Sequence, residues 1–296
     1  MLKLKLSALS VCALFSVSAI SGTMGPVAAE VEHPFYAGLG GSYNSITMNN
    51  KLYAFGISNT YTSGVLSTYG SAGGYSNQLP TTQTTFAPQV QGGYQKHFSG
   101  RKEFWGFKTI YQFLNAHNIN QDIPVAQYGS YTDAGTGLIQ SSPFAGNVVV
   151  ESTEVITNHQ LNFFALMGHS FKHSDIYLGA GPSLFGMQSK INKAWPYANI
   201  DGISTAQSDY PISYSKTMWV WGGGAQLGAT YHLSPSWFLD FNYSYAATSF
   251  NTIKNPILPI GKRAVATVSS SGILYANSSQ SPAVQSLAVT INKKFG

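Results

Sequence analysis

The chain has 296 residues, of which 44% are hydrophobic and only 9% are charged, whereas about 25% of a soluble domain is charged. Ser, Thr, Asn, Gln, Gly and Tyr replace the missing charges, with 30 Gly and 18 Tyr, so the chain is polar without being ionic. This composition disfavours a soluble enzyme, and a formal net charge of +5 does not by itself predict nucleic-acid binding.

Residues 1–29 have the pattern of an export signal. Lys3 and Lys5 precede an apolar run over 6–20, and "VAA" at 27–29 forms a cleavage site before Glu30. We therefore expect a signal peptide over 1–29 and a mature domain over 30–296. An uncleaved anchor is one alternative, although the run is shorter than the roughly 20 residues that span a bilayer as a helix. Lipidation of Cys12, the single cysteine, is another; after cleavage, no disulfide or thiolate metal site remains.

Eight later stretches alternate between large apolar and small polar side chains, which is typical of β-strands with two unlike faces. They cover 34–47, 85–98, 103–114, 159–171, 175–186, 218–233, 237–246 and 285–295. No other stretch reaches 18 consecutive apolar residues, which excludes a helical membrane protein.

The connections between these stretches alternate in length. Three are short, with the sequences "SGRK", "KHS" and "SPS", and the other four run to roughly 25 to 40 residues, which is uncommon in compact soluble domains. Short turns at one end and long loops at the other are typical of bacterial outer-membrane barrels. We therefore predict an all-β fold: a closed, eight-stranded, antiparallel transmembrane barrel with short periplasmic turns and four long extracellular loops.

The faces of this barrel follow from its size. Eight strands enclose a lumen just wide enough for side chains, so two dozen large apolar groups do not fit inside, while the small polar set does. The aromatic face should therefore meet lipid, and closure pairs every backbone group. A soluble, lipocalin-like barrel with the faces reversed is the alternative. Aromatic residues near the strand ends are expected to form lipid-facing girdles; these are Phe98, Trp105, Trp219, Trp221, Tyr231, Trp237 and Phe295.

The leader, the eight strands, the three short turns and the terminal "LAVTINKKFG" resemble the small outer-membrane barrels of the OmpA/OmpX type. The resemblance covers about Phe35 to Phe295 and implies an architecture, not an activity. It also implies insertion by the barrel-assembly machinery and contact with outer-membrane lipids and lipopolysaccharide. One departure is that Phe295 is followed by Gly296, whereas such barrels commonly finish on an aromatic residue. Nothing after the last strand resembles a peptidoglycan-binding domain.

Few residues indicate chemistry. "GLGGSY" and "WGGGAQLG" lack the helix and the lysine of a phosphate loop, and His97, His173 and His232 have no metal-ligand spacing. Candidates for an outer-rim acid, base or nucleophile are Asp122, Asp133, Glu151, Glu154, His117 and His159. Solvated loop residues explain them better, so we predict no enzymatic activity, no metal and no cofactor.

Two charges fall on the expected lumen face. Lys108 and Asp240 lie on strands across the barrel from one another, each a few residues from a short turn. A lone charge in a poorly hydrated lumen is costly, whereas a pair is tolerated. We therefore predict a lumen ion pair that plugs the barrel; separate hydration of the two charges is the alternative.

The first long connection is rich in Tyr, Ser, Gly and Asn, a mixture that combines rigid aromatic area with adaptable hydrogen bonding. We predict an integral outer-membrane protein with a structural or adhesin-like role, whose loops bind host, phage or neighbouring surface molecules. A small diffusion channel is the alternative, and an enzyme that modifies lipid A or cleaves proteins is a distant third. The fourth connection is expected to form a hairpin within 263–276.

Overall fold

The computed structural model describes residues 34–295, apart from 138, 201–202, 207, 254–257 and 266–267. The predicted signal peptide over 1–29 therefore lies outside the described residues. Nowhere in the described part of the chain does a helix occur that is long and apolar enough to cross a membrane.

Twelve strands make up the described fold. They are β1 (Phe35–Thr62), β2 (Val65–Tyr75), β3 (Leu79–His97), β4 (Glu103–Asp133), β5 (Ile139–Ser170), β6 (Ser174–Ile200), β7 (Ile203–Ala206), β8 (Ile212–His232), β9 (Trp237–Ala247), β10 (Asn251–Ile253), β11 (Leu258–Val265) and β12 (Val268–Phe295).

Eight of these strands close a ring in the order β1, β3, β4, β5, β6, β8, β9 and β12, with every neighbouring pair antiparallel. The ring closes through β1 and β12, which pair from Phe35↔Phe295 to Thr62↔Val268. Each of the eight predicted stretches forms one of these strands. The predicted closed, eight-stranded, antiparallel barrel is therefore confirmed.

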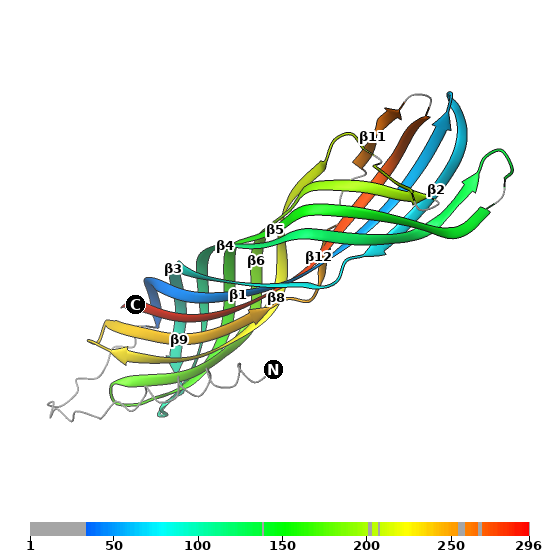
Figure 1. Cartoon of the computed structure of the whole chain (residues 1–296). Coiled ribbons are helices and arrows are strands. Elements are labelled where there is room, and N and C mark those ends of the chain that lie inside the picture. Colours follow the sequence, from blue (N-terminus) through cyan, green and yellow to red (C-terminus); the bar gives the residue numbers. More distant parts are fainter. Residues whose placement is uncertain are drawn as a thin grey trace, which may run out of the picture. The chain divides into compact units, whose positions relative to one another are not determined.

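The four long connections differ from the expected loops, because most of their residues continue the strands. Figure 1 shows β1, β4, β5 and β12 as continuous ribbons that run from the ring to the end that carries β2 and β11. Val65 begins β2 after a two-residue turn in which Ser63 and Gly64 have positive φ. A hairpin lies where one was expected, but it begins before residue 263, since β11 and β12 pair from Val265↔Val268 to Leu258↔Leu274.

Beyond the ring, the barrel wall divides into two sheets. The β3–β4 ladder stops at Gln89↔Gln112 and the β8–β9 ladder stops at Gly223↔Ala247; farther from the short turns, the described residues contain no pairing between β3 and β4 or between β8 and β9. One sheet contains β3, β1, β12, β10 and β11, and the other contains β4, β5, β6, β7 and β8. Strand β2 pairs with both β1 and β4 and so joins the two sheets along one edge. We call this two-sheet part the extension.

The interior of the chain changes character where the extension begins. Inside the ring, most buried side chains are polar, with one apolar cluster of Phe104, Ile110, Phe164, Leu166 and Tyr177 near the short turns, whereas the extension contains two larger apolar clusters. The first includes Ile46, Met48, Leu114, Val155, Phe185, Met187 and Val284, and the second includes Leu52, Ile123, Val125, Val148, Val150, Ile191 and Leu274. A polar layer separates them, in which Asn50 Nδ2 donates to Thr153 Oγ1 and Gln280 Nε2 donates to Ser189 Oγ. The extension therefore has an apolar core between two sheets, as a β-sandwich does.

Candidate functional site

The lumen of the ring brings Lys108 and Asp240 together. Lys108 Nζ, from β4, lies 2.5 Å from Asp240 Oδ2, from β9, and the two side chains are only 2% and 1% exposed. Alternation along each strand points both side chains inward, since their neighbours Phe107 and Phe241 are exposed on the outer wall. The pair thus crosses the lumen, as the sequence led us to expect.

Other lumen side chains complete the coordination of Asp240. The Tyr177 hydroxyl donates to Asp240 Oδ1 at 2.6 Å and accepts from Lys108 Nζ at 2.8 Å. Gln91 Nε2 and Asn242 Nδ2 donate to Asp240 Oδ2 at 2.9 Å and 3.2 Å. The carboxylate therefore accepts four donors, which is the satisfaction that a buried charge requires.

Side-chain amides extend this network along the lumen. Gln112 Nε2 donates to Gln89 Oε1, Gln89 Nε2 donates to Gln91 Oε1, and Gln91 ends the series on Asp240. Glycines allow this packing: a Cβ on Gly228 would lie 2.2 Å from the Tyr177 ring. Sequence reasoning identified the two charges but not Tyr177, which lies on the least regularly alternating of the eight stretches.

The predicted girdle residues all lie on the outer surface. Phe98, Trp105, Tyr231, Trp237 and Phe295 are exposed near the short turns, and Trp219 and Trp221 are exposed at the other end of the ring. Tyr43 and Phe86 mark that same outer end on β1 and β3, with ring centroids 5.1 Å apart. An exposed apolar band between two aromatic ends is the pattern of a lipid-facing barrel wall.

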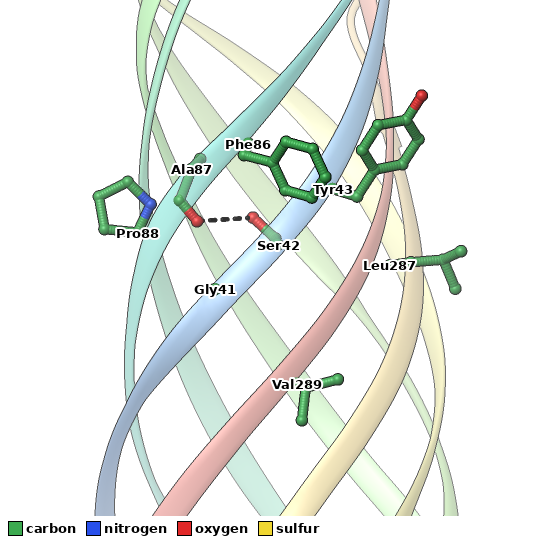
Figure 2. Close-up of a pocket in the computed structure, with 8 residues that line it drawn as sticks. All are labelled: Gly41, Ser42, Tyr43, Phe86, Ala87, Pro88, Leu287 and Val289. Carbon is green, nitrogen blue, oxygen red and sulfur yellow. Dashed lines mark hydrogen bonds between the residues drawn. The ribbon is translucent and has the colours of Figure 1, made fainter.

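A groove of about 620 Å³ lies on this wall, over β1, β3 and β12. Figure 2 shows the rings of Phe86 and Tyr43 side by side at one end, with Leu287 and Val289 along the β12 side. Gly41 and Pro88 are paired across the two strands, and the Ser42 hydroxyl donates to the Ala87 carbonyl at 3.4 Å (Figure 2). Because its lining is mostly apolar, the groove suits a lipid acyl chain better than a polar ligand.

The outer-rim candidates form pairs rather than one site. His117 Nδ1 lies 2.6 Å from Glu154 Oε1, and Lys190 Nζ lies 2.9 Å from Glu154 Oε2, on neighbouring strands just beyond the aromatic band. Partial burial raises the pKa of Glu154, but hydrogen bonds and charges from Lys190 and His117 outweigh it and lower that pKa below its ordinary value. Glu151 separately pairs with Lys193 at 3.0 Å.

The remaining rim candidates have structural contacts. Asp133 Oδ1 accepts from the backbone amides of Gly135 and Thr136 at the end of β4, and Asp122 has a φ of 50° within β4. His159 stacks on Trp219 with ring centroids 5.8 Å apart. The structure therefore joins His117 to Glu154 but does not bring the six candidates together.

The three histidines at the short-turn end also make contacts. His232 Nε2 lies 3.0 Å from the buried Asp175 Oδ2, and His97 Nε2 lies 2.8 Å from Ser170 Oγ. The backbone carbonyl of His173 accepts from the amide of His232. Within the described ranges, no three His, Cys, Asp or Glu side chains converge so as to hold a metal ion.

Comparisons with known proteins point to architecture alone. No family model matches the chain, and no curated protein matches it. Similar solved structures include OprG from Pseudomonas aeruginosa, with 11% identity over 84% of this chain and 95% of that chain and a TM-score of 0.30. Ail from Yersinia pestis has 13% identity over 81% of this chain and 98% of that chain, with a TM-score of 0.19. OprG is an outer-membrane protein, and Ail is an attachment invasion locus protein.

One similar structure corrects an expectation. The outer-membrane protease OmpT from Escherichia coli has 8% identity over 86% of this chain and 97% of that chain, with a TM-score of 0.29. The prediction that the chain has no enzymatic activity, which rested on assigning the acidic and histidine candidates to solvated loops, is therefore withdrawn. Likeness this distant assigns no activity to the chain either.

Proposed function

We propose that the protein is exported through cleavage after Ala29, is inserted into the outer membrane by the barrel-assembly machinery, and acts there as a surface-interaction protein. Its adhesin-like role is carried by the extension, which faces the outside of the cell among lipids and lipopolysaccharide. One observation carries this proposal: the long connections form a sandwich with its own apolar core, and a rigid surface binds a partner with less loss of entropy than free loops do.

The lumen argues against the channel alternative. Lys108, Asp240 and Tyr177 cross the ring, and the first apolar cluster of the extension lies beyond them. A lumen of this width that is filled by side chains leaves no continuous water column. Surface interaction therefore accounts for more of the chain than conduction does.

The test compares Gram-negative cells that display the protein with matched cells that lack it. Binding to host-cell layers, phage and neighbouring bacteria is measured with and without a Fab raised against the extension. We expect the displaying cells to bind one of these surfaces and the Fab to abolish that binding. Equal binding by both cell types to every surface would defeat the proposal.

A further inference from the structure

The two sheets of the extension differ in charge. Lys51 is the single charged residue within 47–75, and 268–283 contain no charged residue. On the other sheet, Glu151, Glu154, Lys190 and Lys193 form ion pairs. Along β1, β2 and β12 the extension thus presents hydroxyls, amides and aromatic rings, with Lys51 as the one charged residue within 47–75 and 268–283. Strand β11, which pairs with the part of β12 nearer the tip, adds Lys262 and Arg263.

Five aromatic rings gather on the outer face of the extension where β2 lies between β1 and β4. Their neighbours in sequence, Leu52, Ala54, Leu274 and Ala276, point into the apolar core, so alternation turns the rings outward. The rings belong to Tyr53 and Phe55 on β1, Tyr75 on β2, Tyr128 on β4 and Tyr275 on β12. We call these five residues, with Gly73, the aromatic platform.

Gly73 lies at the centre of the platform. It is paired with Phe55 on one side and with Tyr128 on the other. A Cβ at Gly73 would lie 3.0 Å from Phe55 Cδ2 and 3.1 Å from the Tyr53 hydroxyl oxygen, so these rings lean over the glycine. Tyr128 and Tyr75 remain 71% and 62% exposed, which leaves much of each side chain accessible to a ligand.

Ring contacts hold the platform in place. The centroids of Tyr53 and Tyr75 are 4.7 Å apart, and those of Phe55 and Tyr275 are 6.0 Å apart. Lys51 Nζ lies 4.5 Å from the centroid of the Tyr75 ring, and no described carboxylate forms an ion pair with it. The platform therefore combines flat aromatic faces with a cation that can accept an anionic partner.

Such a surface matches the chemistry of a sugar. The C–H groups on one face of a pyranose carry partial positive charge and pack against the negative face of an aromatic ring, while its hydroxyls bond to neutral side chains such as those of Ser, Thr and Asn. A phosphate on the same saccharide would pair with Lys51. An apolar protein partner would leave this cation and the neighbouring polar groups unmatched.

The position of the platform indicates the source of that sugar. Tyr53 is ten residues beyond Tyr43, which marks the outer end of the lipid-facing wall, so the platform lies about 25 Å above the membrane for a strand of ordinary rise and tilt. It faces sideways from β1, β2, β4 and β12 rather than from the tip turn at Ser63 and Gly64. A side face at this height meets molecules anchored in the same membrane before it meets another cell.

We propose that the aromatic platform binds the phosphorylated oligosaccharide of lipopolysaccharide in the surrounding outer leaflet. The proposal rests on the outer-membrane location and surface role proposed above, and names the ligand class and the binding face. Tyr75 and Tyr128 stack on the sugar rings, and Lys51 pairs with a phosphate.

Titration calorimetry on the full-length protein, refolded in detergent micelles, tests this. The probe is the phosphate-bearing core oligosaccharide released from lipopolysaccharide by mild acid. We expect wild-type protein to bind it, and Tyr75→Ala and Tyr128→Ala each to weaken binding about tenfold through loss of a stacked ring. Tyr210→Ala serves as the matched control, because Tyr210 is 77% exposed and lies outside the platform, and its binding should equal that of wild type.

Lys51→Gln separates the charge from the stacking. This variant should bind the phosphorylated probe more weakly than wild type does, with less dependence on salt, and should bind a dephosphorylated probe as wild type does. Absence of binding by wild type, or equal weakening by Tyr210→Ala, would overturn the proposal. So would binding of sialylated or sulfated host oligosaccharides alone, or a dimer in sedimentation that Tyr75→Ala abolishes.

The adhesin-like surface role and the platform proposal can be disproved independently of each other. If Tyr75→Ala and wild-type protein bind no saccharide while cells that display them still bind a surface and the Fab still blocks it, the platform proposal falls and the surface role stands. If the wild-type protein binds the core oligosaccharide but displaying cells bind no other surface, the platform proposal stands and the adhesin-like role falls.

Discussion

At the scale of single residues, alternate side chains along a ring strand face the outer wall and the lumen in turn. Phe241 is 39% exposed on the outer wall, whereas its neighbours Asp240 and Asn242 are buried in the lumen. Lipid surrounds the Phe241 side chain, whereas hydrogen bonds within the lumen satisfy the polar groups of Asp240 and Asn242. Adjacent substitutions on one strand should therefore have unlike costs.

Phe241→Lys should lower the free energy of unfolding by up to about 2 to 4 kcal/mol, because it places a charge in lipid near the bilayer midplane. Urea titration in lipid vesicles measures this cost. Phe241→Leu is the matched control and should cost much less, because it keeps an apolar side chain in lipid. Equal costs for the two variants would mean that this face does not meet lipid.

Lys108→Ala and Asp240→Ala should each lower the free energy of unfolding by about 3 to 5 kcal/mol, because each leaves an unpaired buried charge. Tyr177→Phe, which keeps both charges, should cost about 1.5 to 3 kcal/mol through loss of its hydrogen bond to Asp240. The same urea titration measures all three. A smaller cost for Lys108→Ala than for Tyr177→Phe would show that the ion pair does not organise the lumen.

The pair between Glu154 and Lys190 should make stability depend on pH. Because the folded-state pKa of Glu154 is lowered, its contribution is present above the unfolded value of about 4.5 and is lost as pH falls through the folded-state value. Urea titrations between pH 7 and pH 3 should therefore show a smaller loss of stability for Glu154→Gln than for wild type. An identical loss in both proteins would show that Glu154 does not contribute.

At the scale of elements, strand length distinguishes this chain from a barrel with loose loops. β1 and β12 pair over their full length, so their ladder continues well beyond the lipid-facing wall. The two seams, at β3–β4 and β8–β9, let the wall separate into sheets that cover an apolar core. Side chains bridge the first seam, since Thr85 Oγ1 donates to the Leu114 carbonyl and Asn118 Nδ2 donates to Thr81 Oγ1.

Hydrogen exchange measured by mass spectrometry should show the extension to be folded. Peptides that cover 49–62 and 268–283 should exchange far more slowly than free loops do, because their amides take part in the β1–β12 ladder. Peptides that cover 79–88 should exchange faster than these, because β3 there has a ladder on one side. Rapid exchange across all three regions would mean that the long connections are loops after all.

At the scale of the whole molecule, the filled lumen and the apolar core lie in series. Wild-type protein in a planar bilayer should therefore pass ions in rare, small steps. Lys108→Ala should raise the conductance, because the remaining Asp240 carboxylate must draw in water. Lys51→Ala removes the same charge outside the lumen and should leave the conductance unchanged. Large, steady conductance in the wild-type protein, unaffected by Lys108→Ala, would favour the channel.

Much of the ring could be predicted from the sequence by itself. Period-two alternation located all eight ring strands, and the three short connections identified the end of the barrel that carries the short turns. The narrow lumen of an eight-stranded barrel assigned the aromatic face to the outside. Lys108 and Asp240 could be singled out because charges are scarce on inward positions. These predictions succeeded because they depend on local pattern and on simple limits of space.

The tertiary structure decided the rest. The first long connection, which includes Asn49 to Thr62, is predicted as a loop from its Tyr, Ser, Gly and Asn content, yet its Leu52 and Ala54 point inward into an apolar cluster. Tyr177 joins Lys108 and Asp240, and Tyr128 joins Tyr75 around Gly73, only through strands distant in sequence. Period two specifies which residues share a face, but the point at which a ladder stops, and what a face meets, depend on neighbouring strands that the local pattern does not contain.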